Sequence, residues 1–142
     1  MSEDESQPRH FIRHPTDMPI EFDFGEVVSD KREYLENISI GGLAFHSNTA
    51  IKHGSLLLIR IPLSHPVFTA KGEVVWCRIS GDHYDVGIRF LDENTAFRAR
   101  MVEQVCYIQQ YKDEILKKEG RILTGEEAAL EWISKYATNF PR

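Results

Sequence analysis

The sequence predicts a mainly β fold, an antiparallel barrel of six short strands, followed by two C-terminal helices. Up to residue 92, short runs of alternating apolar and polar residues are separated by glycines and prolines, as is typical of half-buried strands joined by tight turns. From Asn94 onward, apolar residues recur every three or four positions, the period of an amphipathic helix. A chain of 142 residues, 42% hydrophobic and 27% charged, is long enough to bury a core as one domain.

Most of the predicted strands end at a turn or a breaker. Gly41 and Gly42 separate the second strand from the third, and Pro62 ends the fourth. Gly81 and Asp82 turn the fifth strand back into the sixth. Many short strands at this spacing favour a closed or nearly closed antiparallel barrel. The predicted strands are residues 18–24, 34–40, 43–46, 55–61, 67–79 and 84–91.

The two predicted helices have their own boundary signals. Asp92 or Asn94 can cap the start of the first helix, and Gly120 can end it. Thr124 and Glu127 have the spacing of a capping box at the start of the second. The apolar stripe of the first helix comprises Phe97, Met101, Val105, Ile108, Tyr111 and Ile115. We therefore divide the chain into a disordered tail (1–8), a barrel domain with a basic arm (9–92) and helices packed on the barrel (93–142).

Net charge, apolar content and residue spacing exclude several classes of function. A net charge of −5 argues against non-specific binding of DNA or RNA. No apolar stretch approaches about 20 residues and no signal pattern precedes the domain, so we expect a cytoplasmic protein without membrane insertion. Cys77 and Cys106 are expected to be reduced thiols. The histidines lack metal-binding spacing and no nucleophile or phosphate-loop motif is present, so we expect no metal, no cofactor and no enzymatic activity.

Two short motifs remain. Arg9 and Arg13 lie four residues apart on a basic arm that nearby prolines keep from forming a long helix. The segment Asn37-Ile38-Ser39-Ile40-Gly41-Gly42 comes about two dozen residues later, at the end of a strand-like run. Taken alone, a solvated basic tail explains the arginines, and an ordinary strand-to-turn transition explains the second segment.

Together, in this order, the two motifs resemble those of the PilZ domain, a receptor for the bacterial messenger cyclic di-GMP. The resemblance covers roughly residues 7–92 and implies a six-stranded barrel whose role is sensing. The ligand-binding residues that it implies are Arg9, Arg13, Asn37, Ser39 and Gly42, with His10, Gly41 and Trp76 as weaker candidates.

The chemistry of these residue types suits such a ligand. The planar guanidinium of arginine donates paired hydrogen bonds to phosphate or to the guanine edge, and ligand binding would order the arm. With a period of two, Asn37 and Ser39 share the outer face of the barrel. We expect Gly41 and Gly42 to adopt positive φ and to leave room for the ligand.

Other positions match the family pattern more loosely. Trp76 lies in a segment similar to the late strands of PilZ barrels, where a tryptophan often lies near the ligand, but a core or rim tryptophan fits it equally well. Many family members carry a further arginine beside the first motif arginine, where this chain has Pro8 and His10. Arg89 is expected to point outward from its strand.

The resemblance leaves the output open. A receptor without an attached output domain would act on an unidentified protein partner, as a monomer or weak homodimer, and the C-terminal helices offer a second surface. A PilZ-like adaptor that has lost nucleotide binding is the alternative. A barrel of the oligonucleotide-binding type is a third hypothesis, which the acidic net charge disfavours.

Overall fold

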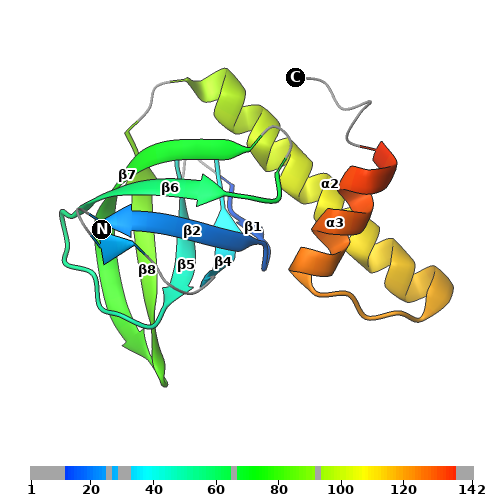
Figure 1. Cartoon of the computed structure of the whole chain (residues 1–142), viewed down its shortest axis with the longest axis horizontal. Helices are drawn as coiled ribbons and strands as arrows, with labels where there is room; N and C mark the ends of the chain where they lie inside the picture. Colours follow the sequence, from blue (N-terminus) through cyan, green and yellow to red (C-terminus); the bar gives the residue numbers. More distant parts are fainter. Residues whose placement is uncertain (1–11, 25–26, 29–32, 65–66, 92–93, 137–142) are drawn as a thin grey trace.

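The described residues form a closed barrel with two helices on one side (Figure 1). The structure is a computed structural model, and it describes residues 12–24, 27–28, 33–64, 67–91 and 94–136. The arm residues Arg9 and His10, and the tail expected over residues 1–8, lie outside the described residues. No helix in the described part of the chain is long and apolar enough to cross a membrane.

The strands confirm the predicted six-stranded antiparallel barrel. Their bounds are β1 (His14–Pro15), β2 (Pro19–Phe24), β3 (Val27–Val28), β4 (Glu33–Ile38), β5 (Gly42–Ser47), β6 (Leu56–Ile61), β7 (Phe68–Ser80) and β8 (His83–Phe90). The ring runs β4-β5-β8-β7-β6-β2 and closes because β2 pairs with β6 on one side and with β4 on the other. The two-residue strands β1 and β3 pair with β4 and β2 outside this ring.

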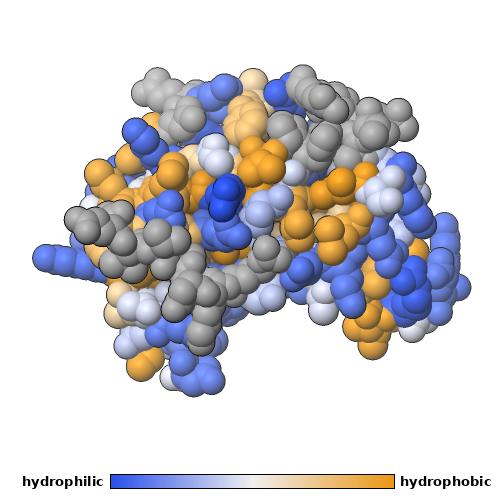
Figure 2. Space-filling model, in the orientation of Figure 1, coloured by the Kyte–Doolittle hydropathy of each residue, from blue (hydrophilic) through white to orange (hydrophobic). Residues whose placement is uncertain are grey.

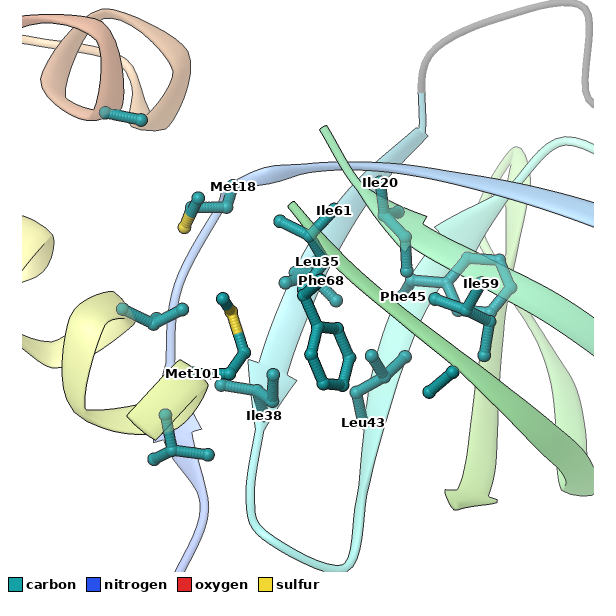
Figure 3. Close-up of a cluster of buried hydrophobic side chains, with 14 of the residues drawn as sticks. Met18, Ile20, Leu35, Ile38, Leu43, Phe45, Ile59, Ile61, Phe68 and Met101 are labelled. Atoms are coloured by element: carbon teal, nitrogen blue, oxygen red, sulfur yellow. The ribbon is translucent and has the colours of Figure 1, made fainter. Parts of the chain in front are cut away.

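Large apolar side chains fill the barrel interior, as the alternating pattern requires. Figure 3 shows Leu43, Phe45 and Phe68 pointing into this interior, and Met101 lying at its end near Ile38. Met101 belongs to helix α2 (Thr95–Glu119), so this helix covers one end of the barrel. On the same helix the ring of Phe97 stacks on that of Phe68, with centroids 5.3 Å apart. Full burial of a side chain such as that of Phe68 stabilises the fold by about 1.5–3 kcal/mol.

Both helices begin at the predicted caps, and α2 also ends at the predicted glycine. The side chain of Asn94 accepts a hydrogen bond from the Phe97 amide at 3.1 Å, and Gly120 ends α2 in the left-handed conformation with φ of 67°. Thr124 and Glu127 form the capping box of α3 (Gly125–Tyr136), since each side chain accepts the other's amide hydrogen, at 2.9 and 3.0 Å. The predicted apolar stripe of α2 faces the core.

Helix α3 packs along α2 through aromatic and charged contacts. The rings of Trp132 and Tyr107 lie nearly parallel, 6.3 Å apart. The Tyr111 hydroxyl donates to Glu131 at 2.7 Å, and Arg121 donates to the same carboxylate at 3.0 Å. Hydrogen bonds from Arg121 and then Tyr111 lower the pKa of Glu131 to about 2. Glu131 on α3 therefore bonds both to Tyr111 on α2 and to Arg121 in the loop between the two helices.

Candidate functional site

Four residues from four neighbouring strands form a row across the outer face of the barrel. Asn37 on β4 pairs with Ala44 on β5, Ala44 with Gly87 on β8, and Gly87 with Trp76 on β7. Residues paired across a sheet share a face, and the adjacent residue Leu43 lies in the core, so this row faces outward. The two central members are small and form a floor between the half-exposed side chains of Asn37 and Trp76.

A β-bulge precedes the residue at each end of the row. The register shifts between Leu35 and Asn37 on β4, and again between Val74 and Trp76 on β7. Each bulge inserts one unpaired residue and reverses the facing of the residues after it. Leu35 and Val74 point into the core, whereas Asn37 and Trp76, two positions later, point outward. The two bulges thus direct the Asn37 amide and the Trp76 indole to the outer face.

The structure brings together the described parts of both sequence motifs. The guanidinium Nη1 of Arg13 donates to the side-chain Oδ1 of Asn37 at 2.8 Å, on the exposed surface. The arm is held there because β1 pairs with the end of β4, His14 opposite Ile38 and Pro15 opposite Asn37. The predicted site residues Arg9 and His10 lie outside the described residues.

The outward orientation predicted for Ser39 is wrong. Strand β4 ends at Ile38, so the alternation does not extend to Ser39, whose side chain is only 2% exposed. Its hydroxyl accepts from the amides of Gly41 at 3.2 Å and Gly42 at 3.3 Å and donates to the Gly42 carbonyl at 3.3 Å. These bonds shape the β4–β5 turn, which positions Asn37 nearby.

The positive φ predicted for Gly41 and Gly42 is also wrong, because neither backbone is in that region. Gly42 begins β5 outside the left-handed region, and its need for glycine comes from close packing. A Cβ at this position would lie 2.1 Å from the backbone carbonyl oxygen of Ile88 on β8. The carbonyl of the preceding Gly41 accepts from the Phe90 amide at 2.9 Å, which ties the turn to the same strand.

At the other end of the row, the indole of Trp76 lies against Gly87. A Cβ on Gly87 would lie 2.1–2.5 Å from three indole atoms, so glycine is needed for this contact. The guanidinium of Arg78 lies over the indole, 4.4 Å from the ring centroid. Sequence reasoning missed Arg78, although its position two residues after Trp76 on one strand predicts the same face.

Arg89 points outward, as predicted, from the next row of the sheet. It pairs with Gly42 on β5 and Glu73 on β7, and its guanidinium bonds the Glu73 carboxylate. The ion pair of Arg89 and Glu73 therefore lies on the outer face of the barrel, one row from the candidate site.

The comparisons with known proteins agree with this architecture. Residues 7–106 match the PilZ domain family. The chain belongs to the PilZ family. The comparison with curated proteins found no match.

Several solved structures share the fold at low sequence identity. The PilZ domain of YcgR from Escherichia coli with c-di-GMP is 17% identical, with a TM-score of 0.61 over 79% of this chain and 99% of that one. The Bacillus subtilis inhibitor of motility (MotI/DgrA) is 16% identical, with a TM-score of 0.57 over 75% of this chain. The K. pneumonia MrkH–c-di-GMP complex is 14% identical, with a TM-score of 0.55 over 82% of this chain. This chain spans about half the length of the last two, 54% and 56%.

Proposed function

We propose that this PilZ domain is a receptor that binds cyclic di-GMP across the row formed by Asn37, Ala44, Gly87 and Trp76. The observation that carries the proposal is the 2.8 Å bond from Arg13 to Asn37, which unites the two motif halves on an exposed face. PilZ domains are receptor or adaptor domains, and the structures of YcgR and MrkH contain c-di-GMP.

Each end of the row offers a different interaction to such a ligand. The Arg13 guanidinium can donate two parallel hydrogen bonds to a phosphate or to a guanine edge, and the Asn37 amide can bond the same groups. Gly87 lets the Trp76 indole lie close to the sheet, and the small side chain of Ala44 keeps the surface low beside it. The Trp76 indole offers a stacking surface, and Arg78 adds positive charge beside it.

The ordering of the arm on binding is part of the proposal. Arg9 and His10, which we expect to reach the ligand, lie outside the described residues. Arg13, in contrast, already lies next to Asn37 in this structure. Binding then requires the Arg13 guanidinium only to turn from the amide to the ligand, which keeps the entropic cost low.

Isothermal titration calorimetry with cyclic di-GMP, and with GTP as a control ligand, tests the receptor function. Arg13→Ala should weaken binding by about tenfold to a hundredfold, since charge-assisted bonds contribute about 1.5–3 kcal/mol. Arg60→Ala is the matched control, because Arg60 is also an exposed arginine but lies on the barrel, where it pairs with Glu21 on the β6–β2 side. Absence of binding by the wild-type protein would instead support an adaptor without nucleotide.

A polar junction connects the arm to the helices. Asp17, four residues after Arg13, accepts hydrogen bonds from the Gly125 amide at 3.1 Å and from the Lys112 ammonium at 3.2 Å. A Cβ on Gly125 would lie 2.2 Å from the Asp17 carboxylate, so glycine lets α3 begin against it. We propose that a ligand-induced shift of the arm reaches α2 and α3 through this junction.

The helices would then present the output surface to a protein partner. Figure 2 shows apolar residues interspersed with hydrophilic ones over the molecule rather than confined to the barrel. The exposed apolar side chains of the helices and the loop between them are Tyr107, Leu116, Ile122, Leu130 and Tyr136. Hydrogen–deuterium exchange with and without cyclic di-GMP tests the route, since protection changes in α3 should be reduced in Asp17→Asn.

A further inference from the structure

Three side chains from two adjacent strands converge on the outer face, one row along from the proposed nucleotide site. His46 on β5 pairs with Asp85 on β8, as Ala44 pairs with Gly87 in the row beside it. His83 precedes Asp85 by two residues on β8 and so shares its face. The fold therefore joins histidines that are far apart in the sequence.

The ligand atoms of these residues lie at distances suited to a metal ion. Nδ1 of His46 is 3.1 Å from Oδ1 of Asp85, and Nε2 of His83 is 3.2 Å from the same oxygen. All three ligand atoms lie within 4.8 Å of one another. Nitrogen and oxygen ligands of a tetrahedral Zn²⁺ bind at about 2.0–2.2 Å, which separates neighbouring ligands by about 3.4 Å. Small side-chain movements would therefore open the cluster around such an ion.

The other nitrogen of His83 is held as metal-binding histidines usually are. Its Nδ1 lies 3.3 Å from the Asp82 carboxylate, and an Nδ1–H donated there leaves the lone pair of Nε2 directed at Asp85. The Nε2 atom is buried and makes no well-aligned hydrogen bond with the described residues. A lone pair facing a carboxylate is unfavourable without a proton or a cation between them, and a bound cation would relieve that repulsion.

The three side chains are exposed enough for a metal ion to reach them and for a fourth ligand to bind it. The side chains of Asp85, His83 and His46 are 13%, 30% and 40% exposed, so a water molecule can complete the coordination. By register the cation facing Asp85 is Arg78, but its guanidinium lies over the Trp76 indole. We propose that His46, His83 and Asp85 bind a divalent transition-metal ion of the zinc type on this face of the barrel.

This site is independent of the nucleotide and is tested without it. Zn²⁺ is titrated by calorimetry into the tag-free full chain, and Co²⁺ is used as a spectroscopic probe of tetrahedral coordination. We expect one ion per chain, and His46→Ala or His83→Ala should each lower the affinity by at least tenfold. Asp82→Ala should lower it by about 10–100-fold, because it removes the acceptor that orients His83.

Two controls separate a built site from incidental histidine binding. His53→Ala changes an exposed histidine outside the cluster and should leave Zn²⁺ affinity unchanged. Metal-free melting curves verify that the variants fold. No Zn²⁺ binding, or binding that survives both His46→Ala and His83→Ala, would overturn the proposal. So would nitrogen NMR shifts that show His83 protonated on both nitrogens with Zn²⁺ present, since the cluster would then be a hydrogen-bonded triad only.

Discussion

The need for glycine at two positions of the site face can be tested by changing each to alanine. The added methyl group would come equally close to a neighbour in both variants, but the neighbours differ. In Gly42→Ala the new Cβ would lie 2.1 Å from the backbone carbonyl oxygen of Ile88. In Gly87→Ala it would lie 2.1 Å from the indole of Trp76. The first neighbour belongs to the sheet backbone, whereas the second is a half-exposed side chain that can rotate. The two variants should therefore differ sharply in stability.

The distance that each neighbour must move determines how much stability each variant loses. Ordinary contact begins near 3.4 Å, so each neighbour must move by about 1.3 Å (3.4 − 2.1). In Gly42→Ala this movement separates β5 from β8, and overpacking of this kind costs about 1–3 kcal/mol or more. For a chain of 142 residues, 1 kcal/mol corresponds to roughly 3 °C in Tm, so we expect a fall of about 3–9 °C. In Gly87→Ala the indole swings outward, which costs on the order of 1 kcal/mol in lost burial.

Urea unfolding followed by circular dichroism, together with ligand titration, distinguishes the two effects. Gly42→Ala should unfold at clearly lower urea concentration than wild type. Gly87→Ala should stay close to wild-type stability but bind cyclic di-GMP more weakly, because Trp76 is displaced. If Gly42→Ala is as stable as Gly87→Ala, the close backbone approach does not explain the glycine, and the reasoning fails.

Three further outcomes can be checked separately. Glu131 is bonded by Arg121 and Tyr111, which lowers its pKa from 4.5 to about 2, so this contribution to stability is present above pH 4.5 and is lost as pH falls towards 2. Acid titration of Tm should show a shallower decline over that range in Glu131→Gln; an unchanged slope would exclude this carboxylate as the cause. Asp17→Asn should lower the free energy of unfolding by about 1–3 kcal/mol in urea titrations, because a charge-assisted junction is weakened, and a stability equal to wild type would argue against the proposed route. Burial raises the pKa of the Cys106 thiol, so it should react slowly with iodoacetamide at neutral pH, and rapid labelling would contradict its packing.

The alternating and helical periods predicted the barrel and both helices, because local patterning fixes which residues are buried. Caps such as Asn94 and Thr124 are local hydrogen bonds, and the sequence therefore located both helix starts. The orientation predicted for Ser39 is wrong because the strand ends at Ile38, two residues earlier than the pattern indicates, and the Ser39 hydroxyl bonds within its own turn. No local pattern could show which backbone would approach Gly42, since that depends on β8.

Contacts between distant residues required the strand register. Only the resemblance to a family motif placed Arg13 and Asn37 in one site, because the two motif halves lie in separate segments of the chain. The convergence of His46 with His83 and Asp85 was missed, because single-sequence metal motifs assume ligands close together in the chain. An H-x-D triplet in a strand, here His83-Tyr84-Asp85, was the one local signal available.

The two β-bulges make the site depend on residue count as well as residue type. Glu36 and Val75 are the residues that the ladders with β5 and β8 skip, directly before Asn37 and Trp76. Deleting Val75 would leave the indole opposite Gly87 but remove the local bend and extra twist that a bulge gives its strand. The curvature of the floor would then change with no change to any side chain of the site. Loss or gain of a single codon is thus a route by which such a barrel could retune a binding face while its core pattern survives.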